Sequence, residues 1–336
     1  MTDISQKTVY FLGAGASNAS DFHLPTMGEF FKGANFAGEE YQNLKRFIKD
    51  KFPGLPIENL NLEEVVTAIE LSMDTFGSFG ERSHPYIYGA RTEFDTYVNA
   101  RLKIPEYKPC SLLIKIFDKD KEKPIESVIT LNYDLIIENC ISARSYKIPG
   151  PRDMLGRMDN LLGQPLHSDI RQNFSLPYEE ANSRLYLKLH GSIDWFYCPN
   201  PDCGFHQQFF PNRNHNIFSS PVRIGDLCRI CGSPVVTAIV PPTMYKTFEK
   251  FPKMGLLWNL AYHKLNIAEK IVIFGVSFAP SDYYLRWLFK KAITDRKNKP
   301  TIINIDSTPQ IGDKIKEITG IAPEHFPTLD EYLAKQ

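Results

Sequence analysis

The chain has 336 residues, and its 39 Lys and Arg residues balance 39 Asp and Glu residues. This zero net charge argues against an electrostatic binder of nucleic acid, which needs an excess of basic residues. Hydrophobic residues make up 43% of the chain, an ordinary globular composition that excludes global disorder. From the length we expect one large domain with an inserted module, or two small domains.

The N-terminal residues lack the pattern of a secretory signal peptide, because no basic segment precedes a long apolar run. The longest apolar stretches, such as IVIFGVSF, are far shorter than a membrane span. The six cysteines are too few and too unevenly placed for a secreted disulfide scaffold. We therefore expect a soluble, cytoplasmic protein without membrane contact, and we find no nucleic-acid-binding module in the sequence.

Five short apolar runs are typical of parallel strands buried on both faces, because their hydrophobicity is continuous rather than alternating. They predict strands at Thr8–Leu12, Ser127–Leu131, Leu185–Leu189, Ile271–Phe274 and Thr301–Ile305. Stretches with sequence patterns typical of helices separate the runs. The pattern predicts an α/β fold with a Rossmann-like, doubly wound parallel sheet.

Two segments interrupt this pattern. Residues 31–120 have helical texture, with apolar residues at helical spacing between Val65 and Met73, after Asn61 as a candidate N-cap. Residues 196–236 are rich in Pro, Asn, Cys, Gly and His. This composition predicts a loop-rich module that needs a cross-link to be ordered. We expect three parts: a sheet domain of residues 1–30, 121–195 and 237–336, a helical insertion at 31–120, and a metal-binding module at 196–236.

The first predicted strand runs into a glycine turn, Gly13-Ala14-Gly15-Ala16-Ser17. Gly13 and Gly15 would let the backbone turn tightly and approach a pyrophosphate, and the following helix would supply amide donors. The dehydrogenase fingerprint needs a third glycine, where Asn18 stands here, and without a Walker motif a P-loop NTPase is not expected. Taken alone, the turn fits a nucleotide site and a ligand-free strand–helix turn about equally.

Polar residues follow the next two strands, at the sheet edge where open α/β folds bind ligands. Asn132 and Asp134 follow the second strand. Asp134 is also explained as a cap of the next helix, whereas a second cap at Asn132 would be redundant. His190 follows the third strand beside Gly191. A lone histidine is more often structural, but its place at this edge favours a general base.

The last two predicted strands also end in polar residues. Gly275 and Ser277 follow the fourth strand, and Asn304 and Asp306 lie at the end of the fifth. Hydroxyl, amide and carboxylate groups at such an edge suit the hydroxyls of a ribose. The simpler explanations are a strand–helix junction for Ser277 and a turn for Asp306.

Four cysteines form two close pairs, with spacings C-x4-C and C-x2-C. These are Cys198, Cys203, Cys228 and Cys231. Two pairs on two turns suit a tetrahedral zinc site, and four thiolates leave no open position for catalysis. We expect a structural zinc ion rather than disulfides or free thiols, with His206 and His215 as alternative ligands. Cys110 and Cys140 are expected in the core.

The order of these motifs resembles the sirtuin-like superfamily of NAD-binding proteins over nearly the whole chain. The motifs are GAGAS, LNYD, LHGS, the cysteine module, GVS and NID. The resemblance implies that Asn132 and Asp134 act at the nicotinamide ribose and that His190 is the general base. The NAD-binding residues that it implies are Gly13, Ala14, Gly15, Ala16, Ser17, Gly275, Ser277, Asn304 and Asp306.

The chain departs from classical sirtuins in two places. Where they carry Gly-Ile-Pro-Asp-Phe-Arg after the glycine turn, this chain has His23-Leu-Pro25-Thr-Met27 and no arginine. Where they carry a Phe-Gly-Glu strand that docks acetyl-lysine peptides, this chain has AIVPPTMYK at 238–246. These stretches are similar to a bacterial sirtuin-like group that typically hydrolyses NAD, often in anti-phage defence.

The resemblance and its departures lead to the hypothesis of an NAD glycohydrolase that releases nicotinamide and ADP-ribose. In this hypothesis Asn132 positions a water, His190 accepts a proton and Asp134 orients Asn132 or the ribose. The alternatives are an NAD-dependent protein deacylase or ADP-ribosyltransferase, and a non-catalytic sensor of NAD or ADP-ribose. We expect a homo-oligomer and, by family analogy, a partner ATPase or another defence protein.

Overall fold

The computed structural model describes residues 7–34, 36, 38–73, 85–105, 108–119, 125–144, 185–198, 200, 203, 210–211, 224, 226–228, 230–240 and 252–336. The chain divides into two compact units. The sheet unit comprises Met1–His23, Ile104–Gly191 and Met244–Gln336. The cysteine unit comprises Leu24–Lys103 and Ser192–Thr243.

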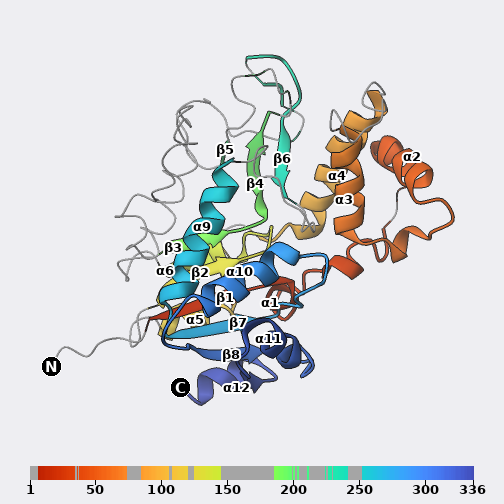
Figure 1. Ribbon diagram of the computed structural model, residues 1–336. Helices are drawn as coiled ribbons and strands as arrows, with labels where there is room; N and C mark the ends of the chain where they lie inside the picture. Colours follow the sequence, from red (N-terminus) through yellow and green to blue (C-terminus); the bar gives the residue numbers. More distant parts are fainter. Residues whose placement is uncertain are drawn as a thin grey trace. The chain divides into compact units, whose positions relative to one another are not determined.

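The sheet unit is built on six parallel strands in the order β3-β2-β1-β7-β8-β9 (Figure 1). They are β1 (Thr8–Leu12), β2 (Ile125–Thr130), β3 (Leu185–Lys188), β7 (Lys270–Phe274), β8 (Thr301–Ile305) and β9 (Glu324–Phe326). In the middle of the sheet, Tyr10 of β1 lies opposite Val128 of β2 and Val272 of β7. The chain adds strands on one side of β1 and then on the other, so the order reverses between β1 and β7. Ligands of open α/β sheets bind at such a reversal.

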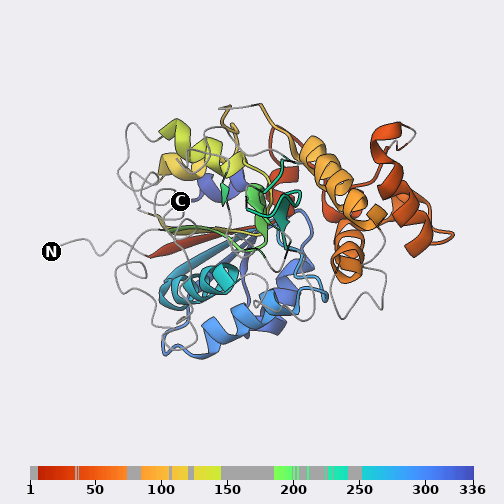
Figure 2. The ribbon, with the colours of Figure 1, turned by 90° about the horizontal axis from the view of Figure 1, so that it is seen from above.

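Helices cover both faces of this sheet. Figure 2 shows α5 (Ile114–Lys119) and α6 (Ile136–Arg144) on one face, and α9 (Pro252–Ile267) and α10 (Tyr283–Thr294) on the other. The other described helices of the unit are α1 (Ala14–Asn18), α11 (Ile311–Thr319) and α12 (Leu329–Ala334). Because both faces are covered, inner strands such as β1 are buried along nearly their whole length, which explains their continuous apolar runs. The predicted doubly wound parallel sheet is confirmed.

The cysteine unit combines helices with a small second sheet. Its helices are α2 (Gln42–Lys51), α3 (Leu62–Met73) and α4 (Pro85–Leu102), with 3-10 turns η1 (Met27–Glu29), η2 (Glu39–Tyr41) and η3 (Ile57–Asn59). Its strands lie in the order β5-β4-β6, namely β5 (Phe210–Pro211), β4 (Gly191–Tyr197) and β6 (Val236–Ile239). The predicted cap of α3 is present, since Asn61 Oδ1 accepts a hydrogen bond from the Glu63 amide at 2.8 Å.

A buried charge network ties α4 to β6 within the cysteine unit. Arg91 Nε lies 3.0 Å from Asp95 Oδ1, and both side chains are fully buried. Asp95 Oδ2 accepts from the Thr237 amide at 2.8 Å, and the Arg91 guanidinium donates to the Thr237 carbonyl. The helical segment and the strand that follows the cysteines are therefore joined by a buried ion pair, in which each charge compensates the other. The part boundaries drawn from the sequence, which separate these segments, stay a prediction.

None of the described helices is both long enough and apolar enough to cross a membrane. The longest, α4, has 18 residues and carries Arg91, Asp95 and Arg101.

Candidate functional site

The residues that the sequence singled out lie at the carboxyl ends of neighbouring strands of the sheet unit. His190 follows β3, Asn132 follows β2, Gly13 follows β1, Gly275 follows β7 and Asp306 follows β8. These strands are adjacent in the parallel sheet, so their ends share one edge. The structure therefore brings together motifs that are far apart in the sequence.

The glycines at the centre of this edge pack backbone against backbone. A Cβ atom on Gly13 would lie 2.4 Å from the Gly275 carbonyl oxygen, and one on Gly15 would lie 2.7 Å from Gly275 Cα. Gly275 itself has a φ of +65°. The Gly13 amide donates to the Phe274 carbonyl at 2.9 Å, and the Gly15 amide to the Gly275 carbonyl at 3.0 Å. Contact between the two turns thus requires these glycines, and it engages the Gly15 amide, one of the helix amides that the sequence interpretation assigned to a pyrophosphate.

Ser17, Asn132 and Asp134 form a buried hydrogen-bonded cluster beside the glycine turn. Ser17 Oγ donates to Asp134 Oδ2 at 2.7 Å. Asn132 Nδ2 donates to Ser17 Oγ at 2.8 Å and to the Gly13 carbonyl at 2.9 Å. Both amide hydrogens of Asn132 are used in this way, which fixes the donor end of the side chain toward the glycine turn and its acceptor Oδ1 on the other side.

Asp134 also caps the helix that follows it, which is the simpler explanation that the sequence suggests for this residue. Its Oδ1 accepts a hydrogen bond from the Ile136 amide at 3.0 Å, at the start of α6. Its other oxygen accepts from Ser17. One carboxylate therefore caps a helix and holds the cluster, so the two explanations are compatible.

His190 lies at the same edge in aromatic surroundings. Its ring centroid is 5.9 Å from that of Trp258 in α9 and 6.3 Å from that of Tyr133. Trp258 Nε1 donates to the Leu189 carbonyl at 2.9 Å and so fixes the strand end that carries the histidine. His190 Nε2 lies 3.3 Å from Asp282 Oδ2, and only 4% and 6% of the two side chains are exposed.

Two charged residues at this edge were missed by the sequence interpretation. One is Asp282, whose position directly before the helix-forming run YYLRWL is typical of an N-cap residue. The other is Lys188, the one charged residue in the apolar run LYLKL. Lys188 is buried, and its Nζ lies 2.9 Å from Glu138 Oε1 and 3.4 Å from the Tyr133 carbonyl, with a further contact to the Asp134 carbonyl.

The remaining predicted residues differ in their surroundings. The Ser277 side chain is exposed, and its carbonyl accepts a hydrogen bond from Lys314 Nζ at 3.0 Å. Asn304 is fully buried, with Nδ2 3.2 Å from the Nδ1 atom of His325 in β9. Asp306 Oδ1 accepts from the Thr308 amide at 2.8 Å, which is the turn contact offered as its simpler explanation.

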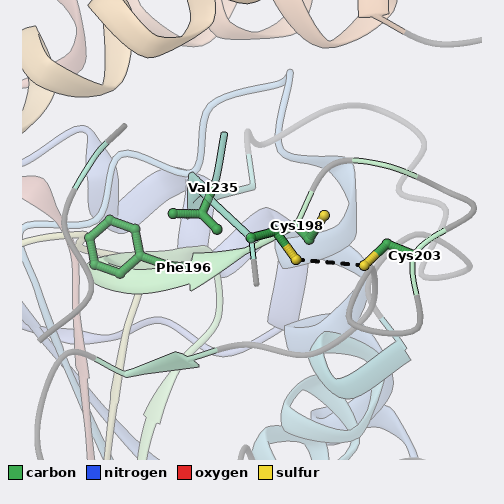
Figure 3. Packing of buried hydrophobic residues seen from close by; sticks show 5 residues of the cluster. Phe196, Cys198, Cys203 and Val235 are labelled. Atoms are coloured by element: carbon green, nitrogen blue, oxygen red, sulfur yellow. Dashed lines mark hydrogen bonds between the residues drawn. The ribbon is translucent and has the colours of Figure 1, made fainter. Parts of the chain in front are cut away.

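The four clustered cysteines converge in the cysteine unit. Their Sγ atoms all lie within 4.8 Å of one another, with 3.5 Å between Cys198 and Cys231 and 3.6 Å between Cys203 and Cys228. A tetrahedral zinc ion with Zn–S bonds of about 2.3 Å holds its sulfurs about 3.8 Å apart. Figure 3 shows Cys198 and Cys203 pointing toward each other, and three of the four cysteines belong to a buried cluster with Phe196 and Val235.

The second cysteine pair lies on a tight turn. The Gly232 amide donates to the Cys228 carbonyl at 2.8 Å, and Gly232 adopts a φ of +72°. Hydrogen bonds from the Ser233 hydroxyl and amide lower the pKa of the Cys231 thiol to about 6. Burial raises the pKa of the Cys198 thiol, in the opposite direction, so compatibility with a structural zinc ion rests on the convergence of the four Sγ atoms rather than on the pKa of one thiol. The alternative ligands His206 and His215 lie outside the described residues.

The two remaining cysteines occupy the core, as predicted. Cys110 and Cys140 are fully buried in the sheet unit. Burial raises the pKa of the Cys140 thiol to about 12, which keeps it protonated and unreactive.

No protein-family model and no curated protein sequence matches the chain. Comparison in three dimensions finds solved structures of Sir2 proteins. A Sir2 homologue in complex with NAD is 16% identical, with a TM-score of 0.45 over 94% of this chain and 89% of that chain. A structure on sirtuin substrate affinity is 16% identical, with a TM-score of 0.48 over 99% of this chain and 93% of that chain. A structure on the mechanism and regulation of Sir2 enzymes is 17% identical, with a TM-score of 0.46 over 99% and 90%.

Proposed function

We propose that this chain is an NAD glycohydrolase, which cleaves NAD to nicotinamide and ADP-ribose. The observation that carries the proposal is the buried cluster of Ser17, Asn132 and Asp134 beside the glycine turn, with His190 on the next strand. This arrangement places an amide, a carboxylate and an imidazole at the strand ends where open α/β sheets bind nucleotides. We propose NAD as the substrate because the order of the motifs resembles that of the sirtuin-like superfamily.

In this proposal NAD lies along the sheet edge. The turn from Gly13 to Ser17 holds the pyrophosphate, and the residues after β7 and β8 hold the adenosine ribose. Those residues are Gly275, Ser277, Asn304 and Asp306. Ser277 has the exposed hydroxyl that suits this role, whereas Asn304 and Asp306 already make contacts within the sheet unit.

The chemical step is hydrolysis of the bond between nicotinamide and ribose. This bond breaks with its electron pair going to the cationic nicotinamide ring, which leaves as a neutral molecule from an oxocarbenium-like ribose. Asn132 positions the attacking water through its Oδ1, since its Nδ2 is held by Ser17 and Gly13. His190 accepts the proton that the water loses. Burial of these groups limits access of other solvent.

The proposal includes a structural role for zinc and a biological setting. A zinc ion held by the four clustered cysteines would order the loop-rich part of the cysteine unit without contacting substrate. The sequence resemblance suggests NAD depletion in bacterial anti-phage defence, with activity controlled by self-assembly or by a partner protein. A plaque assay with and without the chain would test this setting.

The experiment is chromatography of NAD incubated with the full-length chain across a range of protein concentrations. We expect release of nicotinamide and ADP-ribose, with a loss of about 100-fold or more in His190→Ala and normal release in His263→Ala, an exposed histidine. Release that depends on an acetylated peptide would indicate a deacylase instead. Binding of NAD by calorimetry with no product at any concentration would indicate a sensor.

A further inference from the structure

We propose that Asp282 is a positioning residue for His190: its buried carboxylate orients the imidazole and stabilises its protonated form. The inference rests on His190 being the base of the proposed function. It concerns a residue that the motif pattern did not single out, and it is carried by the contact between the two side chains.

The contact is close and buried, and the start of α10 holds the Asp282 carboxylate in place. His190 Nε2 lies 3.3 Å from Asp282 Oδ2. The other oxygen of Asp282 accepts a hydrogen bond from the Leu285 amide at 3.2 Å, because Asp282 is the N-cap of α10. The Asp282 amide donates to the Ala279 carbonyl at 3.0 Å. The carboxylate is thus anchored to the helix start rather than free to turn toward solvent.

Aromatic side chains also pack against the imidazole. Trp258 of α9 and Tyr133 after β2 present aromatic rings. Lys188 lies two residues before His190, and it directs its ammonium to Glu138 and to the carbonyls of Tyr133 and Asp134. Since a buried charge pair is little screened, the Asp282 carboxylate attracts the protonated imidazole strongly.

The consequence for the reaction follows from the two ring nitrogens. With Nε2 facing Asp282, the neutral imidazole is favoured in the tautomer that carries its hydrogen on Nε2. As the water oxygen bonds to the ribose carbon and nicotinamide leaves with the bonding electrons, the proton of the water passes to the imidazole. Asp282 remains ionised and stabilises the imidazolium, which later returns its proton to solvent.

The competing explanation is that Asp282 serves only as a helix cap. Asp282→Asn separates the two roles, because Asn caps helices as well as Asp but carries no charge. The matched control is Asp295→Asn, the same change at the opposite end of α10, where Asp295 is the C-cap.

The test is an NMR titration of His190 in the full-length chain, with its signal assigned by its absence in His190→Gln. An adjacent carboxylate favours the charged imidazole, so we expect the pKa of His190 to fall by about one unit or more in Asp282→Asn, a tenfold or greater loss of proton affinity. Asp295→Asn should leave that pKa unchanged. The same pKa in wild type and Asp282→Asn would overturn the inference.

Turnover of NAD separates this inference from the proposed function. In Asp282→Asn we expect kcat to fall with KM nearly unchanged, and the acid limb of the kcat/KM profile to move to lower pH together with the pKa of His190. If the wild type releases no nicotinamide but the pKa still falls, the pairing holds and the proposed function fails. If His190→Ala abolishes turnover while Asp282→Asn changes neither kcat nor the pKa, the positioning role fails.

Discussion

The hydroxyl of Ser17 donates a hydrogen bond to Asp134 at 2.7 Å, joining two residues that are 117 positions apart in the chain. This bond links the glycine turn after β1 to the loop after β2. It also holds in place the amide of Asn132, which donates to the same hydroxyl. The fold of the sheet edge and the arrangement of the candidate site therefore depend on the same contact.

Ser17→Ala should weaken both the fold and the activity. The variant removes the donor to Asp134 and the acceptor of Asn132, leaving buried polar groups unpaired at a cost of about 1–3 kcal/mol. Urea unfolding would measure that loss, and release of nicotinamide would fall because Asn132 keeps only one of its two Nδ2 hydrogen bonds, the one to the Gly13 carbonyl. Wild-type stability together with wild-type turnover would show that the cluster does not matter.

Gly275→Ala should prevent the two glycine turns from packing. Gly275 has a φ of +65°, and its Cβ would lie 2.2 Å from the Ala16 amide nitrogen, so strain adds to a backbone clash. We expect a loss of about 3 kcal/mol or more in unfolding free energy. Gly320→Ala is the control: φ is +71° there, but the Cβ meets open space, and about 1 kcal/mol is expected. Equal losses in the two variants would contradict the packing argument.

Lys188→Met should be strongly destabilising, and a second change should restore the loss. Without the ammonium, the buried Glu138 carboxylate is left uncompensated, at a cost of about 3–5 kcal/mol. The double variant with Glu138→Gln removes both charges and should recover most of the stability in thermal or urea unfolding. If the double variant is no more stable than the single one, the pair is not the reason for the loss.

Zinc should be present in the purified chain at about one ion per molecule and should stabilise the cysteine unit. We expect metal analysis to find zinc in the wild type, little in Cys228→Ser, and a normal amount in Cys140→Ser, whose thiol lies in the sheet unit. A chelator should lower the melting temperature of the wild type. A chain without zinc that melts at the same temperature with and without chelator would exclude the site.

The sheet was largely predictable from sequence because its strands are buried on both faces. β1 and β8 match the predicted Thr8–Leu12 and Thr301–Ile305 residue for residue. β9 (Glu324–Phe326) was missed, because this short edge strand begins with an exposed Glu and has no apolar run. It joins the sheet through pairing with β8, which no local pattern reports. β4 and β6 were missed for a related reason, since they flank the loop-rich cysteine segment.

The site was predictable only in part. Positions at strand ends made Asn132 and His190 candidates, and they lie at one edge because parallel strands bring their ends together. Their partners were not predictable, since the contact of His190 with Asp282 and that of Asn132 with Ser17 join distant segments. The close packing of Gly275 on the first turn also arises in three dimensions, and it gives the glycines a role in the fold that the sequence could not separate from ligand binding.

The most direct test of the central claim is the rate at which purified full-length wild type, Asn132→Ala and Asn298→Ala release nicotinamide from NAD. The account predicts release by the wild type and by Asn298→Ala, whose side chain is exposed away from the cluster, and a loss of about 100-fold or more in Asn132→Ala. Equal release by all three proteins, or no release by the wild type at any protein concentration, would contradict it.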